Sequence, residues 1–294
     1  MSLQYEVSDE KRIRVILDTD AACEADDPFA IAHALMSPKL IVEGITAEHF
    51  AVEGSVQRSL QEIQTILKAM GREEVPAFEG EKGALDVDAA GDSKAVDFII
   101  SQALKEDRHP LYILAMGAIT NVASAFRKCP EIIGRVTVVW IGTHGTHFGE
   151  LPFREFNAGN DVKAANEVLQ SGAKIWLIPS YVYSTMHIGL AEIQKRIYPC
   201  GAIGRHLFEN MVAYNRTEGA SWTQGESWSL GDSPSVAAVL NPGCGHFTEI
   251  PAPWINEDTS SSPKDDSPVI RIYSDMDSRY VLEDFIGKLQ LLYL

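Results

Sequence analysis

The sequence predicts an α/β fold in which a mostly parallel central sheet is covered by helices on both faces. Short apolar runs alternate with longer amphipathic segments over about the first 180 residues, and parallel strands need such helical crossovers. Hydrophobic residues make up 45% of the 294 positions, enough for one large core. The sequence contains no internal repeat and no linker-like stretch. We therefore expect a single domain over residues 1–294.

The first part of the chain reads as alternating strands and helices. Residues 13–17 form a short apolar run bounded by charge, which is typical of a buried strand. Pro28, with Asp26 and Asp27 before the periodic segment 29–36, indicates a helix start. A Gly- and Asp-rich loop is expected at 79–91. Further strands are predicted at 40–45, 111–115, 136–141 and 174–178, and further helices at 55–70, 94–105, 119–127 and 161–170.

The pattern changes after about residue 180. Residues 191–215 are expected to be mostly helical, and residues 217–231 are rich in Trp, Gly and Glu. Asp232-Ser-Pro indicates the start of an apolar helix that ends at Leu240. A polar loop at 256–266 is expected to separate two strands, and a helix at 274–291 to close the chain.

Charge and cysteine content exclude several classes of partner. The net charge is −16 and the pI is near 4.9, which disfavours nucleic acid and anionic membranes as partners because the field repels both. No run of about 18 apolar residues predicts a membrane span, and the charged N-terminal stretch predicts no signal peptide. Four scattered cysteines form no C-x-x-C pair or disulfide framework. We expect free thiols and a cytoplasmic protein.

Five carboxylates crowd the ten residues from Asp18 to Asp27, D-T-D-A-A-C-E-A-D-D. They follow a predicted strand, at the edge where open α/β sheets bind ligands. Packing like charges this closely is costly unless a cation or protons neutralise them. An all-oxygen set favours Ca²⁺ or Mg²⁺ over softer metals. The alternative is a solvated acidic loop in which Asp26 caps the following helix.

This loop resembles the N-terminal motif of the inosine-uridine nucleoside hydrolase family, D-x-D-x-x-x-D-D, in a bacterial branch with D-T-D-x-x-x-E-x-D-D. Here five residues separate Asp20 from Asp26, and the likeness continues to about residue 240. The resemblance implies a nucleoside hydrolase-like, Rossmann-like fold. It also implies that Asp20 and Asp27 bind Ca²⁺ and that Asp26 binds a ribose hydroxyl. Glu24 lies in the inserted stretch, although alignment from the left would make it the first acid of the pair.

Three later segments resemble motifs of the same family. L-A-M-G-A-I-T-N-V-A (114–123) implies that the Met116 main-chain carbonyl ligates calcium. R-E-F-N-A-G-N-D (154–161) implies that Glu155 and Asn157 bind ribose hydroxyls, with Asp161 starting a helix. G-D-S-P-S-V-A (231–237) implies that Asp232 completes the metal site and contacts the ribose. Each segment, taken alone, could also be an ordinary loop or helix start.

The sequence departs from the family pattern at Gly231. Members that cleave purine or pyrimidine nucleosides carry a His there, often assigned to protonating the leaving base. The early Asn ligand after the second strand is also missing, and that stretch has Glu48 and His49 instead. His49 is therefore a candidate substrate-binding residue. The candidates for the missing proton donor are His49, Glu48, His144 and His147.

Two tryptophans lie shortly before Asp232. Trp222 and Trp228 occur in a Gly- and Ser-rich loop, and an indole ring suits stacking on a nucleobase. We take Trp228 as a candidate base-binding residue, with core or interface packing as the alternative.

The resemblance implies calcium-dependent hydrolysis of the N-glycosidic bond of ribonucleosides, giving free base and ribose. Such reactions pass through an oxocarbenium-like transition state, and Asp20 is the expected general base. Asp18 would hold the ligands in place. The resemblance further implies a role in nucleoside catabolism and purine or pyrimidine salvage, and a homodimer or homotetramer. The alternatives are a hydrolase of another ribosyl compound, a non-catalytic ribose- or nucleoside-binding homologue, and a metal-dependent phosphohydrolase.

Overall fold

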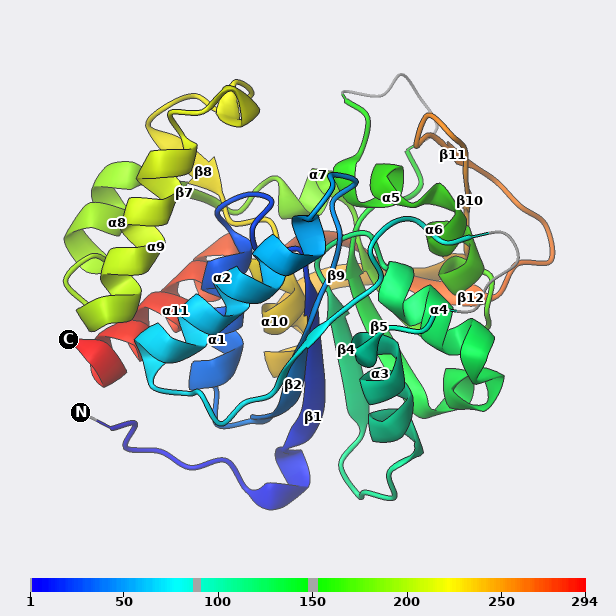
Figure 1. Cartoon of the computed structure of the whole chain (residues 1–294), viewed down its shortest axis with the longest axis horizontal. Coiled ribbons are helices and arrows are strands. Elements are labelled where there is room, and N and C mark those ends of the chain that lie inside the picture. The colour runs from blue at the N-terminus through cyan, green and yellow to red at the C-terminus, as the bar shows by residue number, and fades with distance from the viewer. Residues whose placement is uncertain (1, 87–90, 148–152) are drawn as a thin grey trace.

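The computed structural model describes residues 2–86, 91–147 and 153–294 (Figure 1). An eight-stranded sheet runs through its centre in the order β3-β2-β1-β4-β5-β6-β12-β9. Every pairing in this sheet is parallel except that of β12 with the edge strand β9. The predicted α/β fold with a mostly parallel sheet is therefore confirmed. The strands are β1 (Ile13–Thr19), β2 (Leu40–Ala47), β3 (Ala77–Glu79), β4 (Leu111–Ala115), β5 (Val136–Ile141), β6 (Lys174–Ile178), β9 (Gly245–Pro251) and β12 (Val269–Met276).

Helices cover both faces of the sheet. Successive strand residues point to opposite faces, so Val15 and Leu17 of β1 join one hydrophobic core and Ile16 joins the other. Figure 1 shows α1, α2, α10 and α11 on one side of β1 and α3, α4 and α6 on the other. These helices are α1 (Asp27–Met36), α2 (Ser55–Met70), α3 (Lys94–Leu104), α4 (Thr120–Lys128), α6 (Val162–Leu169), α10 (Ser233–Leu240) and α11 (Ser278–Tyr293).

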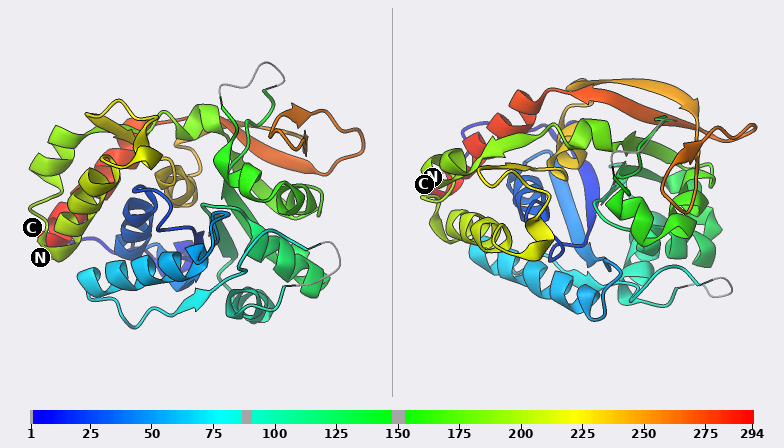
Figure 2. Two further views of the ribbon diagram at one scale, coloured as in Figure 1. Left: turned by 45° about the horizontal axis from the view of Figure 1, so that its top comes forward. Right: turned by 90° about the horizontal axis from the view of Figure 1, so that it is seen from above.

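Smaller elements surround the carboxyl ends of the parallel strands. The hairpin of β7 and β8 lies on the side of the sheet that carries α1 and α2 (Figures 1 and 2). The short strands are β7 (His187–Gly189), β8 (Ser227–Ser229), β10 (Trp254–Ile255) and β11 (Ser261–Ser262). The remaining helices are α5 (Phe156–Asn160), α7 (Ser180–Tyr183), α8 (Leu190–Arg196) and α9 (Gly201–Tyr214), with 3₁₀ turns η1 (Asp9–Lys11), η2 (Pro130–Arg135) and η3 (Glu218–Ala220).

Most boundaries agree with the sequence, and three predictions need correction. The predicted polar loop at 256–266 contains the short strand β11, which pairs with β10. Strands β4, β5 and β6 and helix α2 have the predicted bounds. The last helix begins at Ser278 rather than at residue 274, because residues 274–276 still belong to β12, which pairs with β9. The predicted loop at 79–91 overlaps the end of β3, and its residues 87–90 lie outside the described residues.

The strand order creates a crevice at the carboxyl ends of β1 and β4. From β1 the chain builds outward to β2 and β3, and then returns to place β4 on the other side of β1. Open α/β sheets bind ligands at such a switch point. Asp20 directly follows β1, and Met116 directly follows β4. The fold therefore brings two predicted ligand positions together, although they are far apart in the chain.

Two further expectations can be compared with the structure. All four cysteines, Cys23, Cys129, Cys200 and Cys244, are free thiols, as predicted. Within the described ranges, no helix combines the length and apolar character that a bilayer crossing requires. The single domain over residues 1–294 stays a prediction.

Candidate active site

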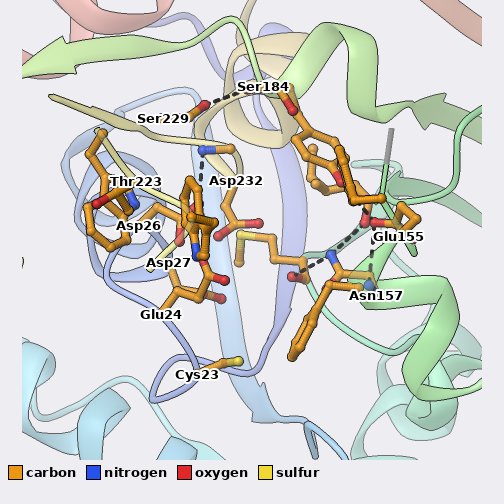
Figure 3. Close-up of a pocket in the computed structure, with 18 of the residues that line it drawn as sticks. Cys23, Glu24, Asp26, Asp27, Glu155, Asn157, Ser184, Thr223, Ser229 and Asp232 are labelled. Carbon is orange, nitrogen blue, oxygen red and sulfur yellow. Dashed lines mark hydrogen bonds between the residues drawn. The ribbon is translucent and has the colours of Figure 1, made fainter. Parts of the chain in front are cut away.

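The floor of the site consists of carboxylates from the two ends of the chain. Asp27 begins α1, with Pro28 fixing the first turn, and Asp232 stands directly before α10. One oxygen each of Asp26, Asp27 and Asp232 lies within 4.8 Å of the others. The loops that carry them are joined by a hydrogen bond from the Gly231 backbone N–H to Asp26 Oδ2, at 2.9 Å. Figure 3 shows this group on one side of a cavity.

Asp20 lies beside this group but is not one of the three. It is buried and lines the cavity, and its Oδ2 has no hydrogen-bond partner. The sequence assigned Asp20 to the metal and Asp26 to the sugar, whereas the compact group contains Asp26. The Asp27 side chain, unlike Asp20 Oδ2, has a hydrogen-bond partner, because its Oδ1 accepts the Thr19 hydroxyl.

Burial perturbs the acidity of every carboxyl in this group. It raises the pKa of Asp26 to about 6 and, together with the charge of Asp26, that of Asp27 to about 7. Burial and the neighbouring acids raise the pKa of Asp20 and Asp232 well above the usual range. Burial raises the pKa of Glu24, at the cavity wall, to about 8. Such crowding of carboxyl groups with raised pKa values is typical of functional sites. A bound cation would offset the repulsion between their charges.

The group can hold a metal ion. Ligand oxygens on opposite sides of one Ca²⁺ lie about 5 Å apart, and the three carboxylate oxygens lie within 4.8 Å of one another, close enough to share one ion. All the donors are oxygens, and the unpartnered Asp20 Oδ2 is available as a further one. The donor chemistry therefore fits a hard divalent cation.

The opposite wall carries the predicted sugar-binding residues (Figure 3). Asn157 Nδ2 donates to the Met116 carbonyl at 3.2 Å and to the Ile141 carbonyl at 2.8 Å, which ties α5 to the ends of β4 and β5. Glu155 caps α5 by accepting the Asn157 and Ala158 N–H groups. Its Oε1 also accepts the Tyr183 hydroxyl at 2.9 Å. The wall is thus preorganised by its own hydrogen bonds.

Aromatic side chains form the outer part of the cavity, whose volume is about 660 Å³. Trp228 is buried and meets Trp222 edge-on at 5.2 Å between ring centroids. Trp222 is 51% exposed, so part of its side chain remains accessible. Tyr183 and His187 also line the cavity. They were not predicted from the sequence, because the short elements that carry them give no periodic signal.

None of the four candidate proton donors is among the described residues that line the cavity. His49 is buried, its Nε2 bonds to Thr120 Oγ1 at 2.8 Å, and its Nδ1 accepts the Ala51 N–H. His144 is also buried, between Ser180 and the Phe153 carbonyl. Neither they nor Glu48 and His147 are among the described residues that line the cavity. The structure therefore does not bring His49 to the substrate position that the sequence suggested.

Gly231 leaves no room for a larger side chain without adjustment. A Cβ at this position would come within 3.1 Å of Asp26 Oδ2 and 3.4 Å of the Tyr183 ring. A Cβ at position 231 would therefore require Asp26 to move by a few tenths of an ångström, and would be in ordinary contact with the Tyr183 ring.

Comparison with known proteins agrees with this geometry. The sequence model of the inosine-uridine preferring nucleoside hydrolase family matches residues 15–262, which include the carboxylates of the floor and the opposite wall. The chain belongs to this family. The match begins within β1 and ends at β11, so the family region contains the whole cavity lining.

Two curated relatives are ribonucleoside hydrolases. The chain is 29% identical to the non-specific ribonucleoside hydrolase RihC of Escherichia fergusonii over 185 residues, which are 56% of this chain and 60% of that protein. It is 27% identical to the pyrimidine-specific ribonucleoside hydrolase RihA of Salmonella arizonae over 71% of this chain and 74% of that protein. The chain thus spans about three fifths of the length of RihC.

A solved structure shows the same fold. A plant nucleoside hydrolase superposes with a TM-score of 0.78 at 20% identity, covering 94% of this chain and 98% of that one. At this identity the likeness establishes the architecture, and the chemistry has to be argued from the site itself.

Proposed function

We propose that this protein hydrolyses the N-glycosidic bond of ribonucleosides, with Ca²⁺ bound at the carboxylate floor. The observation that carries the proposal is the convergence of Asp26, Asp27 and Asp232 within 4.8 Å at the base of a 660 Å³ cavity. Family membership and relatives named as ribonucleoside hydrolases support it.

The metal ligands would be Asp20, Asp27, Asp232 and the Met116 carbonyl. All four residues line the cavity, and together they offer the oxygen donors that Ca²⁺ prefers. When bound, the ion would supply a positive centre that orients the sugar hydroxyls and lowers the pKa of water. Asp26, from the same carboxylate group, would bind a ribose hydroxyl. Its Oδ2 accepts the Gly231 N–H.

Other side chains of the cavity would act on the attacking water, the sugar and the base. Asp20 would accept the proton of the attacking water as general base, since its Oδ2 is free of other hydrogen bonds. Glu155 and Asn157 would orient the ribose from the opposite wall. Trp228 and Trp222 would hold the base in the aromatic part of the cavity.

We infer a homodimer or homotetramer and a cytoplasmic enzyme of nucleoside salvage, with nucleosides as its small-molecule substrates. The free thiols support the cytoplasmic location.

The test is base release from purine, pyrimidine and nicotinamide ribosides, with and without EDTA. Asp20→Ala is the matched catalytic variant, and His49→Gln is the control for a buried polar group away from the cavity. We expect release by wild type and His49→Gln that is lost on chelation and in Asp20→Ala. Calcium binding without release from any riboside would instead support a non-catalytic binding protein or a hydrolase of another ribosyl compound.

A further inference from the structure

Glu48 is a buried carboxyl that the proposed reaction does not use. It directly follows β2 at the carboxyl edge of the sheet and is 1% exposed. Its Oε1 accepts the Ile119 backbone N–H at 3.0 Å. Its carboxyl group also lies within hydrogen-bonding reach of that of Asp18, whose Oδ1 is held by Thr46 and Asn121. Glu48 therefore links the ends of β1 and β2 to the start of α4.

The turn that Glu48 contacts carries the Met116 carbonyl. This turn, residues 116–119, joins β4 to α4, and Ile119 adopts a φ of +62°. A β-branched residue in the left-handed region is strained and persists where its surroundings hold it. The hydrogen bond from the Ile119 N–H to Glu48 Oε1 is one such restraint. The Trp140 indole, which donates to the Gly117 carbonyl at 3.0 Å, is another.

Gly117 shows how closely Glu48 approaches the metal-binding residues. A Cβ at Gly117 would lie 2.1 Å from Glu48 Oε2 and 3.0 Å from Asp20 Cγ. Gly117 is thus packed between the carboxyl groups of Glu48 and Asp20. A shift of Glu48 would be transmitted to the turn and to the neighbouring Asp20.

We propose that Glu48 is a positioning residue that fixes the 116–119 turn and thereby the position of the Met116 carbonyl in the cavity lining. This inference rests on the proposed function, because it assigns Glu48 to the same metal site. Without the Glu48 acceptor, the buried Ile119 N–H loses its partner and the strained turn relaxes. The Met116 carbonyl then shifts from the position in which it accepts Asn157 Nδ2 at 3.2 Å.

Calcium affinity measured by titration calorimetry on the full chain tests this role, with kcat and KM as a second readout. Glu48→Ala should weaken calcium binding about 10- to 100-fold, the usual effect of losing a residue that orients metal ligands. Glu48→Asp withdraws the carboxyl by one methylene and should also weaken binding. Glu48→Gln keeps an acceptor for Ile119 and a donor for Asp18, so it should restore affinity to within about threefold of wild type.

Asp284→Ala is the matched control for general destabilisation. Asp284 is a partly buried carboxyl on α11 that bonds to His33 and Lys288, and it is not among the residues lining the cavity. This variant should lower the melting temperature and leave calcium affinity unchanged. If Glu48→Ala and Glu48→Asp likewise lose stability but bind calcium as wild type does, Glu48 is merely structural and the inference is overturned.

A double-mutant cycle tests the contact without any metal. Gly117→Ala should be strongly destabilising in wild type and cost less in the Glu48→Ala background, because the clash partner is gone. Additive losses in melting temperature would overturn the contact. Absence of calcium binding by wild type would overturn both this inference and the proposed function, whereas unchanged affinity in the Glu48 variants alone would overturn only this one.

Discussion

The raised pKa of Asp27 predicts that the metal-free protein loses stability as the pH rises toward neutrality. Its pKa is about 7 in the folded state, against 3.8 in the unfolded chain. Between these values the folded state binds more protons, so the free energy of unfolding falls with increasing pH. From pH 5 to pH 7 this amounts to ~2 units at ~1.4 kcal/mol each, or about 3 kcal/mol.

Asp27→Asn removes this contribution, together with the part of the raised pKa of Asp20, Glu24 and Asp232 that the Asp27 charge causes. The amide is nearly isosteric, does not titrate, and can still accept the Thr19 hydroxyl. Burial lowers the pKa of His33 and His49, which adds stability with rising pH in the same window, but both proteins share this effect. The quantity of interest is therefore the difference between wild type and variant.

Urea unfolding in EDTA at pH 5 and at pH 7.5 measures this difference. We expect the stability of wild type relative to Asp27→Asn to fall by about 3 kcal/mol between the two pH values. Added calcium should reverse the loss in wild type, since a ligand of the folded state stabilises it. Parallel changes in the two proteins across this window would refute the argument that the Asp27 charge is uncompensated.

Three further substitutions separate the proposed roles. Asp20→Asn should lower kcat by about 10²- to 10⁴-fold if Asp20 is the general base, and a kcat within threefold of wild type would contradict that role. Trp222→Ala should lower kcat/KM by about 10- to 100-fold through lost base stacking while the melting temperature stays unchanged, because Trp222 is 51% exposed; steady-state kinetics and a thermal melt decide this together. His49→Gln should cost about 1–3 kcal/mol of stability yet leave kcat/KM within about threefold, and a large kinetic loss would return His49 to the catalytic candidates.

The local sequence predicted the parts of the fold that have a strong repeating pattern. The apolar run Val136–Ile141 is β5, and Asp26-Asp27-Pro28 marks the start of α1. These signals depend on neighbouring residues, so one sequence suffices to find them. Residues 274–276 were assigned to the last helix instead of β12, because strand pairing with the distant β9 decides their conformation.

The site was predictable where a motif carries its own chemistry. Asp27 and Asp232 are 205 residues apart in the chain. The family resemblance alone identified both, and the structure brings them together. Burial was not predictable in the same way: His49 follows β2 and reads as a loop residue, but the fold encloses it beside Thr120. Tyr183 was missed because the four-residue helix α7 gives no pattern in the sequence.

The stoichiometry of products before and after metal removal tests the central claim most directly. A ribonucleoside that the wild-type protein cleaves would be incubated with EDTA-treated protein, and again after calcium is restored, while free base and reducing sugar are both measured. The account predicts equal amounts of base and ribose with calcium, and neither without it or with Asp232→Asn. Equal release from metal-free protein, or calcium binding with no release of either product, would contradict it.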